Sequence, residues 1–474
     1  MKNKNHIMKA RITSTELICL VIEKKAYSSD NAILPIIKYI ISNAILEAKI
    51  ELLKPTLKLI KLILSLSRPS ITLARSENTL SVLELLKHPD TQVVSDSLDI
   101  IKKVITIQSP TNEIIAQYCN KFNIIVGLND DSLTLKYLYH MGIFVRTPET
   151  FVQFIKAEEN IKGFEICLSS NNKSVLAYAF QLVFAFLSNQ SSMNAFTTLT
   201  PSIVAHLSSE NKGIAAIAAS CLTVIIMNKQ GEFDETVFVP ETTKFIGESF
   251  AIPELRQCGL RLAGVISMTF AGARFLDASD IMPLITNLLL SENTVTRKLA
   301  YMAYASFTTS FPLSKNVLSS VPNFVSALED QDVQPYPLLC ITSITEVPGG
   351  PAACIDSLLQ LSNLFDANDD ETITKVFTAL INIFSDTSIA EGLDNPKVIK
   401  EIFEKTKRFW ESPVFMDFSF ELIETISLLH KGRAILRKYE VTKFAIENID
   451  NPKYKSVRRH FLKIISRTKA LDKQ

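Results

Sequence analysis

The stretch LSSENKGIAAIAASCLTVII, residues 207–226, decides the fold of this chain. An apolar residue and a Ser-x-Asn turn open it, and Asn211 can cap the free N–H groups of a following helix. Ala218, Leu222 and Ile225 then recur at helical spacing and form one apolar face. The stretch therefore predicts a turn followed by a helix whose small residue, Ala218, lets a neighbouring helix approach closely.

Four further segments, starting at Leu86, Leu168, Leu289 and Phe365, align with this one without gaps. Each has a capping residue four positions in, a close-packing position eleven in, and large apolar residues fifteen and eighteen in. The capping residues are Asp90, Asn172, Asn211, Asn293 and Asp369, and the close-packing positions hold Ser97, Ala179, Ala218, Ala300 and Val376.

Weaker copies give starts at 86, 128, 168, 207, 248, 289, 328, 365, 409 and 449, about 40 residues apart. An apolar helix precedes each start, as Ile281, Leu284 and Ile285 show. A unit of this kind cannot bury its apolar face alone, so units must stack. We expect an all-α, right-handed α-solenoid of about ten to eleven repeats over 45–474, continuous with a tail and capping helices at 1–44.

The leading Leu, the Ser-x-Asn/Asp turn and the Leu-rich helix resemble the armadillo repeat family. Residues 207–226 and 289–308 match best, and weaker copies extend the resemblance over about 45–466. HEAT repeats are the alternative, and the period near 40 together with the turn favours armadillo.

Well-known armadillo proteins hold peptides on a concave ladder of Asn, with a Trp four residues earlier, on the last helix of each repeat. At the matching offsets this chain has one Asn, Asn382, and its single Trp, Trp410, lies elsewhere. The resemblance therefore implies the fold and not that binding chemistry.

Composition and motifs argue against an enzyme or a membrane-spanning protein. Seven scattered cysteines without a C-x-x-C pair favour a reducing compartment, cytoplasmic or nuclear. The uncharged stretch 174–209 has an apolar part too short to cross a bilayer. Phosphate-loop and catalytic motifs are absent, and the six histidines lack metal-ligand spacing, so we expect them to be solvated or to cap helices. No catalytic residue, cofactor or metal is predicted.

Charge is unevenly distributed along the chain. Residues 1–70 and 451–474 each carry +7, so residues 71–450 carry −13. A candidate basic patch recurs every four residues on the expected final helix, and a shorter stripe lies near the start. The basic patch is Lys455, Arg459, Lys463 and Arg467, and the shorter stripe is Lys54, Lys58 and Lys61.

These ends are either solvated caps or docking points for RNA, an anionic membrane or an acidic partner. Nucleic-acid binding along the acidic body is disfavoured.

The inward-facing offsets, thirteen and seventeen positions after each start, hold mostly uncharged residues and form a candidate protein-binding groove. Its residues are Gln181, Ser220, Arg261, Met302, Ser306, Thr345, Thr378 and Asn382. The sequence thus predicts a non-catalytic scaffold or adaptor that binds one or more proteins or peptide segments. The alternative is an electrostatic docking module that uses the basic ends.

Overall fold

The computed structural model describes residues 2–24, 30–47, 49–66, 81–145, 148–157, 159–228, 235–393 and 395–469. These residues form helices and connecting turns without a strand, which confirms the all-α prediction. The chain divides into two compact units, Met1–Asn228 and Lys229–Gln474. The domain boundary expected after residue 44 falls inside helix α2 (Asp30–Glu47).

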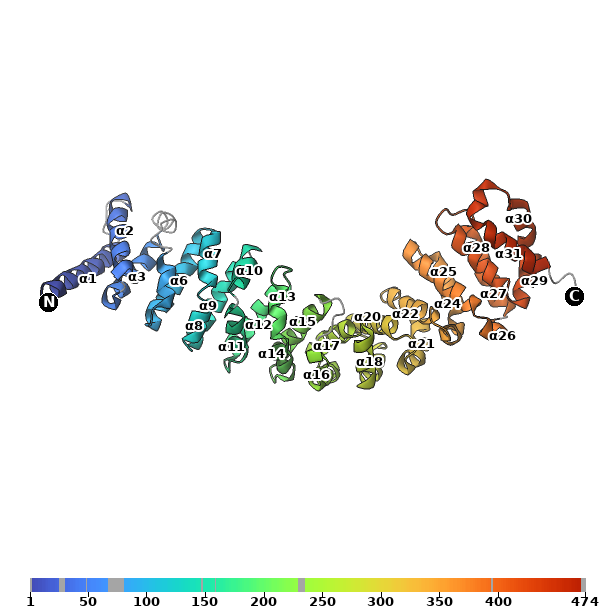
Figure 1. Ribbon diagram of the computed structural model, residues 1–474, viewed down its shortest axis with the longest axis horizontal. Helices are drawn as coiled ribbons and strands as arrows, with labels where there is room; N and C mark the ends of the chain where they lie inside the picture. The colour runs from blue at the N-terminus through green and yellow to red at the C-terminus, as the bar shows by residue number, and fades with distance from the viewer. Residues whose placement is uncertain are drawn as a thin grey trace. The chain divides into compact units, whose positions relative to one another are not determined.

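Within each unit, one helix of each repeat packs beside the corresponding helix of the next repeat, and we call these the third helices. In the first unit they are α3 (Ile50–Ile63), α6 (Thr91–Ile107), α9 (Asp131–Phe144), α12 (Lys173–Leu187) and α15 (Lys212–Asn228). In the second unit they are α17 (Pro253–Ile266), α20 (Thr294–Ser310), α22 (Pro335–Thr345), α25 (Asp370–Ser385), α28 (Met416–Ile426) and α31 (Arg458–Lys469). The described residues thus hold eleven third helices, and within each unit every one packs beside the next (Figure 1).

The remaining helices connect and cover the third helices. In the first unit, besides α2, they are α1 (Lys2–Glu23), η1 (Ser81–Lys87), α7 (Asn112–Cys119), α8 (Phe122–Gly127), α10 (Pro148–Ile155), α11 (Glu159–Leu168), α13 (Met193–Phe196), η2 (Thr197–Leu199), α14 (Thr200–Ala205) and η3 (His206–Ser208). In the second unit they are η4 (Glu235–Val237), α16 (Pro240–Ala251), α18 (Phe270–Ala278), α19 (Ile281–Leu288), α21 (Lys315–Ala327), α23 (Gly350–Ala353), η5 (Ile355–Ser357), α24 (Leu358–Asn363), η6 (Leu364–Asp366), η7 (Thr387–Ile389), α26 (Ala390–Leu393), α27 (Pro396–Thr406), η8 (Lys407–Phe409), α29 (His430–Lys438), α30 (Val441–Asn448) and η9 (Pro452–Val457).

All five predicted capping residues accept hydrogen bonds from the first turn of a third helix. Asn211 Oδ1, for example, accepts from the backbone N–H of Gly213 at 3.0 Å. In three repeats the preceding Ser hydroxyl also accepts from the backbone N–H of the capping residue. This bond gives the Ser-x-Asn pattern its physical reason, because it holds the turn that presents the cap.

The predicted core positions are also confirmed. The close-packing residues Ser97, Ala179, Ala218, Ala300 and Val376 are fully buried, and the large apolar residues fifteen and eighteen positions in are all at most 5% exposed. Each third helix therefore buries one face against its own repeat. Four of the five close-packing positions hold a small side chain, Ser or Ala, and Val376 occupies the fifth.

A close turn leads from a third helix into the next repeat. In this turn, one residue lies against the backbone carbonyl of a residue six positions earlier, near the end of the third helix. In three repeats a glycine occupies this position, at Gly272, Gly350 and Gly432. A Cβ atom added to Gly350 would lie 1.8 Å from the carbonyl oxygen of Ile344. Elsewhere a hydroxyl uses the same site, since Thr150 Oγ1 donates to the carbonyl of Phe144 at 2.7 Å. The turn thus requires either no side chain or one that satisfies the carbonyl.

Polar bonds also join consecutive repeats, and several of them link residues 41 or 42 positions apart. Lys136 Nζ donates to the hydroxyl of Ser95, and Asn228 Nδ2 donates to the carbonyl of Leu187, each 41 residues apart. Lys405 donates to the Asn363 side chain 42 residues earlier. The first two bonds join neighbouring third helices and help to fix their register, and the third joins α24 (Leu358–Asn363) to α27 (Pro396–Thr406).

Candidate protein-binding surface

Thirteen positions after the leading residue, third-helix side chains point away from the core. Core residues lie eleven, fifteen and eighteen positions in, so position thirteen falls on the opposite side at 3.6 residues per turn. Gln181, Arg261 and Met302 are exposed there, and Ser220 and Thr378 are half-buried. These predicted groove residues are therefore accessible.

The second unit brings three groove residues onto two adjacent third helices. Arg261 lies on α17, and Met302 and Ser306 lie on α20, which packs directly beside α17. Met302 is 40% exposed, and Ser306 is half-buried. In the part of the chain that the structure describes, Arg261 forms no ion pair. This surface combines an apolar side chain with a cation and a hydroxyl.

Thr345 does not belong to the accessible surface, because it is only 3% exposed. Its helix, α22, packs against α20, α21, α23 and α25 and is buried along almost its whole length. The Thr345 hydroxyl is used internally and donates to the carbonyl of Thr342 at 2.8 Å. Asn382 on α25 is half-buried.

The first unit exposes aromatic residues that the sequence reasoning missed. Tyr139 on α9 occupies position thirteen of its repeat and is 45% exposed, and Phe184 on α12 is 37% exposed. The predicted start at residue 128 would put the capping residue at position 132, but the residue that caps α9 is Asp130. Because of this shift of two residues, the predicted start did not place Tyr139 at position thirteen. Aligning the repeats by their capping residues identifies the position.

Tyr139 links three consecutive third helices. The ammonium group of Lys102 on α6 lies 4.8 Å from the centre of its ring, and Tyr178 on α12 packs edge to face against it at 6.1 Å. Cation–π and edge-to-face contacts of this kind are attractive and hold the ring in one orientation. The first unit therefore presents a fixed aromatic side chain rather than a mobile one.

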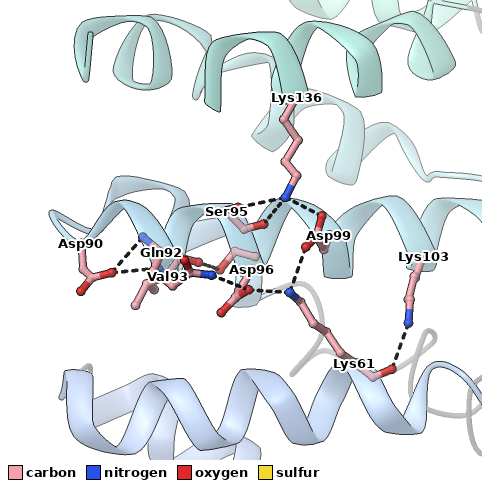
Figure 2. Close-up of polar contacts among 10 residues, drawn as sticks. Lys61, Asp90, Gln92, Val93, Ser95, Asp96, Asp99, Lys103 and Lys136 are labelled. Atoms are coloured by element: carbon pink, nitrogen blue, oxygen red, sulfur yellow. Dashed lines mark hydrogen bonds and ion pairs between the residues drawn. The ribbon is translucent and has the colours of Figure 1, made fainter. Parts of the chain in front are cut away.

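A network of charges joins α3, α6 and α9 and uses part of the shorter basic stripe (Figure 2). Lys61 on α3 contacts Asp96 and Asp99 on α6 at 2.5 and 2.9 Å, and Lys136 on α9 contacts Asp99 at 2.6 Å. Burial raises the pKa of Asp99, but hydrogen bonds from Lys136 and Lys61 lower it by more. Asp99 therefore remains ionised and joins three repeats. Lys54 and Lys58 are also paired, with Asp90 and Glu23.

The basic patch at the C-terminal end is largely neutralised. Lys455 lies in η9, before α31 begins, so the predicted single stripe on one helix was wrong for this residue. Arg459 contacts Asp417 at 3.2 Å, and Lys463 and Arg467 contact Glu424 at 2.9 and 3.3 Å. Three of the four predicted cations therefore join α31 to α28.

Glu424 is the centre of this contact and is 7% exposed. Burial raises the pKa of its carboxyl, but hydrogen bonds from Lys463 and His460 lower it by more. His460 Nδ1 lies 2.7 Å from Glu424 Oε2. The expectation that histidines are solvated or cap helices was wrong for His460 and His140, which are both buried.

Several cysteines of the described residues are buried. Burial raises the pKa of Cys119, Cys167, Cys340 and Cys354 to about 12, which leaves these thiols protonated and unreactive. No group of three or more His, Cys, Asp or Glu is placed there to hold a metal ion. None of the described helices is long and apolar enough to cross a membrane.

Comparisons with known proteins agree with the observed architecture. An engineered protein is similar over 83% of this chain and 99% of its own, with a TM-score of 0.66 and 15% identity. A structure from work on the phosphorylation switch that controls the interaction between cadherin and beta-catenin is similar over 95% of this chain and 100% of its own, with a TM-score of 0.65 and 10% identity. The fold is an α-solenoid of helical repeats. No family model matches the chain, and no curated protein matches it.

Proposed function

We propose that the chain is a non-catalytic scaffold of the armadillo-like type, which binds protein or peptide segments on the exposed side of its third helices. One observation carries the proposal. Arg261 and Met302 project from adjacent third helices of the second unit, and both are exposed, with Ser306 half-buried beside them. Arginine and methionine are enriched at protein interfaces, where both contribute large contact areas.

The fold likeness supports binding of proteins rather than small molecules. A structure of this fold comes from work on the interaction between cadherin and beta-catenin. Stacked repeats present extended surfaces that suit a partner segment. The uncharged residues Gln181, which is exposed, and Ser220, which is half-buried, suit the same use on α12 and α15 of the first unit.

Docking through the basic ends is the weaker alternative. Lys54, Lys58 and Lys61 are paired within the first unit, and Arg459, Lys463 and Arg467 within the second. An ion that already has a partner must give it up before it binds an external phosphate, which reduces its net contribution. Lys455 is left as an exposed member of the predicted patch.

Affinity purification from the cells that express the chain tests the proposal. We compare the wild type with Met302→Glu/Ser306→Glu, which places two charges on the exposed side of α20. A matched control, Ser319→Glu/Ser326→Glu, changes two exposed residues of α21 instead. Folding of all three proteins is checked by circular dichroism.

We expect the α20 variant to lose partners that the wild type and the α21 control retain, and we expect recovery to depend weakly on salt. Identical partners for all three folded proteins would contradict the use of this surface. Partners lost only after Arg459→Ala/Lys463→Ala would instead place function at the C-terminal end.

A further inference from the structure

A polar cavity of about 490 Å³ lies in the second unit, between two successive turns that lead into third helices. Residues 328–334 before α22 form one wall, and residues 360–369 before α25 form the other. Three carboxylates line it, from Glu329, Asp366 and Asp369, and five carboxamides, including Gln331 and Gln360. No Lys or Arg lines the cavity. Its volume falls in the range of ligand-binding pockets.

The cavity lies in the most acidic part of the chain. Residues 316–394 contain twelve Asp and Glu and a single base, Lys375. Lys375 pairs with Glu371 on its own helix at 2.5 Å. A concave site with walls of one charge sign concentrates ions of the opposite sign. The field of this segment therefore favours a cationic ligand.

The walls of the cavity are held by contacts with neighbouring repeats. Arg297 contacts Asp330 at 3.0 Å and fixes the first turn. Arg408 contacts Asp366 at 2.7 Å and Lys405 donates to the side chain of Asn363, so both residues of the second turn are held by cations of the next repeat. Asp369 caps α25 by accepting from the backbone N–H of Thr372 at 2.8 Å, and this bond lowers the pKa of its carboxyl. The site is thus a preformed hollow rather than a loose loop.

Hydrogen-bond acceptors remain available in this hollow. Glu329 is exposed and forms no ion pair among the described residues. Gln360 Oε1 is buried and receives no hydrogen bond from the part of the chain that the structure describes. Because this oxygen has almost no accessible surface, the Gln360 side chain must rotate toward the hollow before a ligand can donate a hydrogen bond to it, and the bond then satisfies an acceptor that lacks a donor. The free N–H groups of α25 would oppose a cation, but Asp369, Asp370 and Glu371 lie at that helix end.

We infer that this cavity receives an arginine side chain of an extended partner segment. A guanidinium carries five N–H donors in a planar fork, which can bind the Glu329 carboxylate and a carboxamide oxygen together. A lysine ammonium has three donors and is more strongly hydrated, so it should bind less tightly. A bound metal is disfavoured, because the described carboxylates do not form a metal-binding group. The inference rests on the proposed scaffold function and assigns a basic segment as partner.

Binding of labelled peptides to the full chain, followed by fluorescence anisotropy, tests the inference. The probes are octapeptides of alternating Arg and Ser, Lys and Ser, or Glu and Ser. The decisive variant is Glu329→Lys in the exposed wall. The matched control is Glu346→Lys, which makes the same charge change at the other end of α22, roughly 15 Å away.

We expect saturable binding of the Arg peptide, weaker binding of the Lys peptide and none of the Glu peptide. Glu329→Lys should weaken Arg-peptide binding at least tenfold, and Glu346→Lys less than twofold. Gln360→Glu adds a carboxylate to the wall of the cavity and should increase the affinity for the Arg peptide about threefold or more.

Equal weakening by the two charge reversals would show general attraction to an acidic surface and overturn the site. Absence of saturable Arg-peptide binding to the wild type would overturn it as well. Neither result would contradict the scaffold proposal. That proposal is tested separately, by the partners that Met302→Glu/Ser306→Glu recovers in affinity purification.

Discussion

Substitution of Gly350 by alanine tests the close turn between α22 and α23. The added Cβ would lie 1.8 Å from the carbonyl oxygen of Ile344 and 2.7 Å from its carbon. Ordinary contact begins at 3.4 Å, so the two segments must separate by about 1.6 Å. Both atoms belong to the backbone, and no rotamer change can relieve the clash. Overpacking of this kind costs typically 1–3 kcal/mol, and we expect about 3 kcal/mol.

Thermal unfolding followed by circular dichroism measures the effect. About 3 kcal/mol corresponds to a fall in Tm of roughly 6–12 °C for a unit of this size. Gly264→Ala on α17 is the matched control, because its added Cβ would make an ordinary contact of 3.5 Å with Ala303. Alanine is a better helix former than glycine, so the control should be neutral or stabilising by up to about 1 kcal/mol.

Equal Tm values for the two variants would refute the reasoning. They would mean that the turn opens without cost and that glycine is not required there. Gly272 and Gly432 face the same contact in other repeats, so the same substitution at either should reproduce the loss.

Three further predictions concern the core, the caps and the C-terminal contact. Ala300→Arg should cost more than about 3 kcal/mol in urea unfolding, because it places an unpaired charge in a fully buried contact, whereas exposed Lys455→Ala should cost under about 0.5 kcal/mol. Asp369→Ala should cost about 1 kcal/mol through loss of the cap, and Asp369→Asn should restore most of it if the hydrogen bond is what matters. The folded-state pKa of Glu424 is lowered, so its charge stabilises the fold above the unfolded pKa of about 4.3, and this contribution is lost as pH falls through the folded-state value. Glu424→Gln should therefore flatten the loss of stability between about pH 5 and pH 3, and an unchanged slope would exclude the ion network as its cause.

The repeats could be predicted because their signals are local. Asn211 and Ala218 lie seven residues apart, and capping and helical periodicity operate within that distance. The same signals failed where a repeat departs from the average. The sequence predicts Thr345 in the groove, but the neighbouring helices enclose α22 and bury this residue. The residues next to Thr345 in the sequence do not indicate that its helix is enclosed.

The charged surfaces could not be predicted for a different reason. The spacing of Arg459, Lys463 and Arg467 correctly placed them on one helix, but their partners Asp417 and Glu424 lie about 40 residues earlier. The pairing of these charges depends on the register of α31 against α28. The composition and local spacing of the sequence do not determine that register. A stripe of like charge in a repeat protein can therefore face the preceding repeat instead of a partner.

Bonded positions in consecutive repeats lie about 33 to 43 residues apart, and this short separation also bears on how the chain is made. Closing a loop of that length costs roughly 3 kcal/mol of chain entropy, and the cost is the same for every repeat added. A ribosome synthesising about 5–20 residues per second releases one repeat every 2–8 s or so. Closure of such a loop is far faster than that. Each repeat can therefore dock on its predecessor before the next has emerged, and the nascent chain leaves little apolar surface uncovered at any moment.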